Sequence, residues 1–215
     1  MEHATRFAKL VVVQHGFVTG VCVSVAAHDN RVAFVDGAQR QFAAAEMPPT
    51  SIGHLQFTVH IMASPAAAEA QFPTVVARLR AFFTTMACDP TKLRPVSTWD
   101  NGDESRAFAC DTIMEGVPVP LLIIAWRVGR LVYTAVSAAL SGDQVNELTA
   151  ILARVKGRSY QDSPVRMDPT TGMRTGVAWD LLPGPEDIPE RLVLLREIPT
   201  KPAQAGCRHR RGGHG

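Results

Sequence analysis

Residues 54–62 carry the clearest pattern in the chain, a strict alternation of apolar and polar side chains. The apolar members are Leu55, Phe57, Val59 and Ile61, and the polar members are His54, Gln56, Thr58 and His60. A period of two predicts a strand that buries one face and leaves the other solvated or partly covered. The two histidines are six residues apart, which is about 20 Å along an extended strand, so they cannot bind one metal ion together.

Two other stretches have the 3–4-residue apolar spacing of amphipathic helices. The first begins after the cap residue Ser64 and Pro65, and Pro73 inside it predicts a kink or a restart. Its apolar positions are Val75, Val76, Leu79, Phe82, Phe83 and Met86. The second begins at a capping box of Ser141 and Gln144 and ends before Gly157. Its apolar positions are Val145, Leu148, Ile151, Leu152 and Val155.

Between these helices the pattern predicts an antiparallel meander over residues 106–115, 118–126 and 130–138, divided by glycine-containing turns. The strand at 118–126 is apolar on both faces, which is typical of a central position. The strand at 130–138 contains Tyr133, Thr134 and Ser137, which favours a place nearer an edge.

The first 50 residues read as strands followed by a short helix. Valine-rich segments at 9–14, 18–26 and 31–36 predict a small meander that ends at an Asp36-Gly37 turn. The alanine- and glutamine-rich segment 38–46 predicts a short helix, which Pro48-Pro49 stops.

The order of elements predicts an α+β fold, because strands come in runs separated by single helices. We expect an antiparallel sheet packed with two main amphipathic helices in one domain over residues 1–157. Residues 158–200 form a proline-rich arm, and 201–215 a disordered basic tail. The arm carries Trp179, Leu181 and Leu182, which make it too apolar for a free linker. It either docks on the same domain as edge strands or binds a partner chain.

Composition excludes several classes of protein. The chain has 215 residues, 46% of them hydrophobic and 20% charged, so it is neither a disordered polyelectrolyte nor a membrane bundle. Its formal net charge is +2, but the last fifteen residues hold four cations and no acid. The rest is therefore slightly acidic, and we expect no nucleic-acid partner beyond weak contact by the tail. We also expect no membrane span.

The four cysteines, Cys22, Cys88, Cys110 and Cys207, lack the spacing of a zinc site, and we expect no metal and no cofactor. A Cys88–Cys110 bridge requires an exported chain. Export depends on whether the apolar stretch 10–27, with its Ser24-Val25-Ala26 segment, is a signal peptide or two strands. Polar residues interrupt the stretch, so we expect a cytoplasmic protein, with a secreted one as the alternative.

No catalytic motif with a physically required spacing is present, and we assign no catalytic residues. The alternative is a hydrolase-like enzyme whose site is assembled from loops, with His28, His54 or His60 near Cys88.

An amphipathic strand closing on Ser64-Pro65 is followed by a helix, an antiparallel meander, the run Arg130-Leu-Val-Tyr-Thr-Ala-Val-Ser, a Ser-Gly-Asp loop and a closing helix. With these features, residues 54–157 resemble the PsbP-like fold family. That family includes extrinsic photosystem subunits, adaptor chaperones of bacterial type VI secretion and actinobacterial secreted lipoproteins. The resemblance implies a non-catalytic binding or adaptor protein that recognises another polypeptide. Trp179, Leu181 and Leu182 are the predicted partner contacts.

Overall fold

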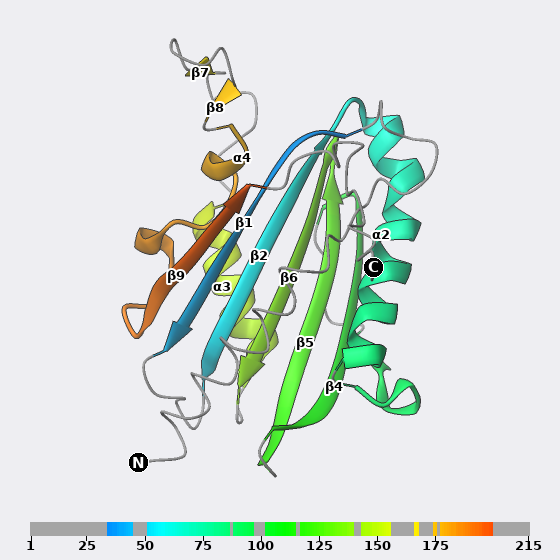
Figure 1. Cartoon of the computed structure of the whole chain (residues 1–215), viewed down its shortest axis with the longest axis vertical. Coiled ribbons are helices and arrows are strands. Elements are labelled where there is room, and N and C mark those ends of the chain that lie inside the picture. The colour runs from blue at the N-terminus through cyan, green and yellow to red at the C-terminus, as the bar shows by residue number, and fades with distance from the viewer. Residues whose placement is uncertain are drawn as a thin grey trace, which may run out of the picture.

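Seven strands form one sheet in the order β3-β4-β5-β6-β2-β1-β9, and each neighbouring pair is antiparallel (Figure 1). The computed structural model describes residues 34–44, 51–86, 88–96, 102–114, 117–139, 143–155, 166–167, 174–175 and 177–199. The sheet strands are β1 (Phe34–Ala44), β2 (Ile52–Met62), β3 (Arg94–Pro95), β4 (Glu104–Met114), β5 (Val117–Val128), β6 (Leu131–Ala139) and β9 (Leu192–Pro199). The predicted α+β class with an antiparallel sheet is confirmed.

The remaining elements are short or lie on the faces of the sheet. The α-helices are α2 (Pro65–Met86), α3 (Gln144–Val155) and α4 (Val177–Asp180). Two 3-10 turns are η1 (Pro90–Lys92) and η2 (Pro185–Asp187), and a separate two-stranded pair is formed by β7 (Arg166–Met167) and β8 (Arg174–Thr175). Among the described residues, no helix combines the length and the apolar character that a membrane crossing needs.

The two longer helices cover opposite faces of the sheet. Leu148 and Ile151 of α3 belong to the largest apolar core, whereas Phe72 of α2 belongs to a separate one. Successive residues of β5 divide between these cores: Ile124 joins the first and Ala125 the second. This division follows from the side-chain period of two along a strand.

Residues 38–44 of the segment predicted as a helix over 38–46 are instead part of β1, so that prediction is wrong there; positions 45 and 46 lie outside the described residues. Alanine and glutamine favour helices, which is why the local pattern predicts one. In the structure, however, β1 pairs with β2 on one side and with β9 on the other. These two ladders involve residues far away in the chain, and tertiary pairing overrides local propensity. Ala38 and Phe42 face the largest core, at the alternating positions that a strand requires.

The predicted turn at Asp36-Gly37 is also inside β1, at a register shift between Phe34 and Asp36. A bulge of this kind lets a strand continue where turn residues suggest that it ends. The predicted strands 9–14 and 18–26 lie outside the described residues, as does the first half of 31–36, whereas residues 34–36 belong to β1.

The meander is confirmed as β4, β5 and β6, and the strand at 54–62 as β2. The prediction that 130–138 lies nearer an edge is wrong, because β6 is the central strand of the sheet. Its polar groups have particular partners that suit an interior strand. The Ser137 hydroxyl donates to Gln144 Oε1 at 2.6 Å, and the Tyr133 ring stacks on Trp126 with centroids 4.9 Å apart.

The start of α2 is capped as predicted, since Ser64 Oγ accepts a hydrogen bond from the Ala67 amide at 3.1 Å. The helix runs through Pro73 without a break in its hydrogen-bonded span. The cap of α3 differs from the prediction: Asp143 Oδ1 accepts from the Asn146 amide at 3.0 Å.

Gln144, the predicted partner in a capping box, bonds elsewhere. Its amide nitrogen donates to the Pro120 carbonyl at 3.0 Å, and its oxygen accepts from Ser137. The residue therefore ties the first turn of α3 to β5 and β6 rather than capping the helix.

Candidate binding surface

The C-terminal arm docks on its own domain over residues 177–199. Leu181 and Leu182 are 2% and 0% exposed and belong to the largest core, beneath the sheet face that α3 also covers. Trp179 packs against the same core while remaining half-buried. The two leucines are therefore buried within the chain, whereas Trp179 stays partly accessible, and the partner contact at Trp179, Leu181 and Leu182 stays a prediction.

Arg40 on β1 joins the parts of this arm to each other. Its Nε donates to Glu197 Oε1 of β9 at 2.8 Å, and its Nη1 donates to the carbonyls of Leu182 and Pro183 at 3.2 Å each. The guanidinium also lies 5.6 Å from the centroid of the Trp179 ring. Because planar guanidinium groups can serve several acceptors at once, one side chain positions β9 and the segment after α4 together.

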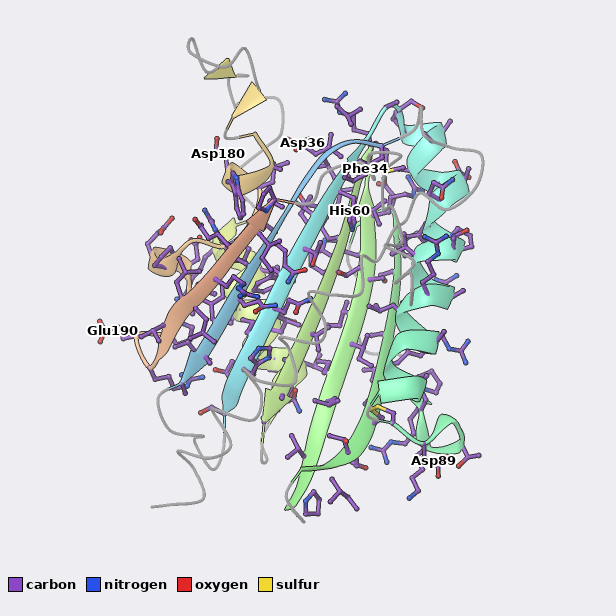
Figure 2. All side chains as sticks on the ribbon, in the orientation of Figure 1. Phe34, Asp36, His60, Asp89, Asp180 and Glu190 are labelled. Atoms are coloured by element: carbon purple, nitrogen blue, oxygen red, sulfur yellow. A yellow bond between two sulfur atoms is a disulfide. The ribbon has the colours of Figure 1, made fainter. Side chains whose placement is uncertain are left out.

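A second anchor holds the turn before β9. Arg191 forms an ion pair with Glu147 of α3, and the other oxygen of Glu147 accepts from the Ile52 amide of β2 at 2.8 Å. Arg154 donates to the carbonyl of Asp187 in η2 at 3.0 Å. Figure 2 shows Glu190 at the turn where β9 starts and Asp180 in α4 near the other end of the strand. The Arg191–Glu147 ion pair therefore holds the start of β9, and the Arg40–Glu197 bond holds the strand near its other end.

The outer side of β9 is an edge of the sheet with three consecutive exposed apolar side chains. Val193, Leu194 and Leu195 are 54%, 37% and 44% exposed. The strand pairs only with β1 in the sheet, and Figure 1 shows it as the outermost strand on that side. Exposed apolar edge strands are uncommon because they template pairing with other chains. We call Val193, Leu194 and Leu195 on this edge the β9 edge.

The opposite edge of the sheet is β3, which consists only of Arg94 and Pro95. Both side chains are exposed, and Arg94 forms an ion pair with Asp111 of β4 at 3.2 Å. Proline and charge are the usual means of preventing a strand from pairing further. The two end strands therefore differ in length and in the exposure of their apolar side chains, although β9 also has protective features: a register shift at Leu195, the charged Arg196 and Glu197, and Pro199.

The polar row predicted on β2 is present, and it is buried. His54, Thr58 and His60 are all buried. Gln56 Oε1 accepts a hydrogen bond from Gln41 Nε2 of β1 at 3.0 Å. Burial lowers the pKa of His60 to about 4, because desolvation penalises the imidazolium. Its Nδ1 has no hydrogen-bond partner among the described residues, and Phe34 packs edge-on against the ring at 5.4 Å, as Figure 2 shows. His60 is therefore neutral at pH 7.

Cys88 and Cys110 form a disulfide that joins the segment after α2 to β4, and both side chains are buried. Neither sulfur is then a thiolate, which is the nucleophile that the predicted Cys/His site would use. His54 and His60 lie at opposite ends of β2, and His28 lies outside the described residues. The described part of the chain brings no group of three His, Cys, Asp or Glu residues within reach of one metal ion.

A cavity of about 360 Å³ lies between β4, β5 and the start of α3. Its charged and amide groups include Arg94, Asp111 and Gln144. Arg94 pairs with Asp111, and both ends of the Gln144 amide bond to the chain. The cavity is thus bounded by polar groups that already have partners, so it is a weaker candidate site than the β9 edge.

No protein-family model and no curated protein matches this chain. Among solved structures it is similar to the crystal structure of PA94, a protein of unknown function from Pseudomonas aeruginosa. The two are 15% identical with a TM-score of 0.27, over 66% of this chain and 87% of that chain. A TM-score this low carries no argument about function.

The sequence pattern does not single out the β9 edge. The missing information was which of its residues face outward. An apolar run of Leu192 to Leu195 has no alternation, so the pattern could not separate the inward Leu192 from its exposed neighbours. The register with β1 makes that distinction.

Proposed function

We propose that this chain is a non-catalytic adaptor or chaperone-like protein that binds another polypeptide through the β9 edge. The observation that carries the proposal is the exposure of Val193, Leu194 and Leu195 on a strand that is anchored on both flanks. A rigid apolar edge loses little conformational entropy when it orders a partner, so contacts made there translate into affinity.

The resemblance of residues 54–157 to PsbP-like proteins supports the same class of function, because that family consists mostly of binding proteins. Burial of the apolar residues after α4 supports it as well, because it leaves the outside of β9 as the accessible apolar part of the arm. The proposal keeps the function in the C-terminal arm while moving the contact residues.

The test is capture of interacting proteins from native extract by three forms of the full chain: wild type, Leu195→Lys and Ile113→Lys. Ile113 on β4 is a matched control, because it is 74% exposed and apolar but lies away from β9. We expect one set of polypeptides retained by wild type and Ile113→Lys and lost with Leu195→Lys. Equal retention by all three forms would remove the β9 edge from the function.

We further propose that the chain acts outside the cytoplasm, the alternative that the sequence left open. The disulfide between Cys88 and Cys110 supports export, because structural disulfides persist in oxidising compartments and are rare in the cytosol. Both sulfurs belong to buried residues, which fits a structural bond better than a catalytic one.

Intact-mass analysis after alkylation tests this location. Protein taken from its native cells and alkylated without reductant is expected to lack label at Cys88 and Cys110, and to gain two labels after reduction. Full labelling of both residues before reduction would place the chain in a reducing compartment.

A further inference from the structure

The backbone of the β9 edge is open along one side. The strand spans Leu192–Pro199 and pairs with β1 on its inner side, with a register shift at Leu195, while no described strand lies on its outer side. The outward N–H and C=O groups of such an edge are available to a further strand, which is how many domains bind extended peptides.

The exposed side chains point to both faces of the sheet. Leu194 lies opposite Phe42, which faces the largest core, whereas Val193 lies opposite Ala43 on the alternate position. A docked helix would cover one face only, whereas an added strand lies beside both rows of side chains. The distribution of apolar surface therefore fits an extended segment better than a helix.

The charged residues near the β9 edge indicate which charge a partner segment carries. Arg191 pairs with Glu147 and Glu197 pairs with Arg40, so two of the nearby charges are neutralised within the chain. Arg196 has an exposed side chain and no ion-pair partner among the described residues. A carboxylate on an added strand opposite Arg196 would supply the missing charge.

From these observations, and resting on the proposed function, we infer that the β9 edge binds an extended segment of the partner by antiparallel strand addition. Each ladder in the sheet is antiparallel, and an antiparallel segment would meet Arg196 first and then Leu195, Leu194 and Val193. The partner segment accordingly carries an acidic residue followed by three apolar residues.

The experiment uses the full chain and two synthetic ten-residue peptides. One has a glutamate followed by three valines and flanking threonines, and the control has lysine in place of the glutamate. Amide hydrogen exchange of β9 is measured with increasing peptide. Strand addition protects alternate amides on each side of the register shift at Leu195, because only outward N–H groups gain partners. We expect the lysine peptide to bind about threefold to fivefold more weakly, the range of one cross-strand charge pair.

The variant Arg196→Glu provides a reciprocal control. It reverses the preference, so that the lysine peptide binds more tightly than the glutamate peptide. Unchanged preference in this variant would overturn the charge assignment. Protection that rises with protein concentration in the absence of peptide would mean that a second copy of the chain takes the edge, and would overturn the inference.

The outcomes also separate this inference from the proposed function. Capture of a polypeptide that depends on Leu195, without alternate-amide protection by either peptide, would reject strand addition and leave the binding function standing. Absence of both the Leu195-dependent capture and the alternate-amide protection would reject both the binding function and strand addition. Alternate protection by the glutamate peptide without any captured protein would support the mode of binding and count against an adaptor in native extract.

Discussion

The strands at the two edges of the sheet differ in length and in the exposure of their apolar side chains. At one edge, β3 has two residues, Arg94 and Pro95, and an ion pair to Asp111. At the other, β9 has eight residues, and its central apolar side chains are exposed. Unpaired edges promote association, and proteins usually protect them with charge, proline or brevity. β9 has such features as well, namely a register shift at Leu195, the charged Arg196 and Glu197, and Pro199, yet Val193, Leu194 and Leu195 remain exposed on it.

The difference extends to how each edge is held. β9 is anchored by Arg40 and by the Arg191–Glu147 ion pair, and its neighbours Leu181 and Leu182 are buried. On the β3 side, the disulfide of Cys88 with Cys110 ties the segment before β3 to β4. The open edge is therefore firmly positioned, as a preformed binding surface requires.

The largest expected effect comes from removing the arm. Truncation after residue 158 removes Leu181, Leu182, Ile188 and Leu192, each buried. At about 1.5–3 kcal/mol per buried side chain, the loss is comparable with the whole free energy of unfolding of a domain. We expect this form to aggregate or to lose its cooperative thermal transition in calorimetry.

A truncation after Pro199 is the matched control, since it keeps all of β9 and is expected to leave the transition unchanged. A form ending at residue 158 that unfolds cooperatively near the wild-type temperature would show that the arm is not part of the core.

The next effect is a loss of stability in acid on the β9 side of the sheet. His60 has a folded pKa of about 4 and an unfolded value of 6.5, so the unfolded state binds more protons between these pH values. The free energy of unfolding therefore falls as the pH drops from 6.5 towards 4, by about 3 kcal/mol in total. Because His60 lies opposite Gly37 of β1, amide exchange should increase first in β1 and β2.

Urea denaturation at several pH values checks this prediction. His60→Gln removes the titrating group, so the slope between pH 5 and 6.5 should flatten in that variant, above the range where carboxylates titrate. An unchanged slope would mean that another group carries the acid sensitivity.

A smaller expected effect is the difference in unfolding free energy lost when Arg40 beside β9 or Arg94 in β3 is replaced. Arg40→Met removes the hydrogen bonds to Glu197 and to two carbonyls from a partly buried site, and we expect a loss of about 2–3 kcal/mol in unfolding free energy. Arg94→Met breaks an exposed pair at the β3 edge and should cost about 0.5 kcal/mol or less. Chemical denaturation of the two variants gives the comparison directly, and equal losses would mean that Arg40 does not anchor the arm.

Local patterns predicted the elements that form from adjacent residues. The alternation at 54–62, the helix after Ser64 and the meander at 106–138 were all correct, because side-chain period and caps act within one element. The α+β class followed from their order.

Errors arose where pairing with distant residues decides the structure. Residues 38–44 form a strand because β2 and β9 lie on both sides of them, and β6 is central because β2 pairs with it. Burial within the arm depends on distant residues as well: Leu181 and Leu182 are as apolar as Leu194 and Leu195, and only packing against the sheet separates the buried pair from the exposed pair. The Cys88–Cys110 disulfide could be predicted only as a possibility, because the fold decides which cysteines lie close together.

The most direct test of the central claim is photo-crosslinking in native cells from single positions on the full chain. A photoreactive residue replaces Leu195 in one form and Ile113 in the other, so the open edge is compared with an equally apolar position elsewhere. We predict that one polypeptide crosslinks at position 195 and is absent or much weaker at 113. The same pattern of crosslinks at both positions, or none at 195, would contradict the account.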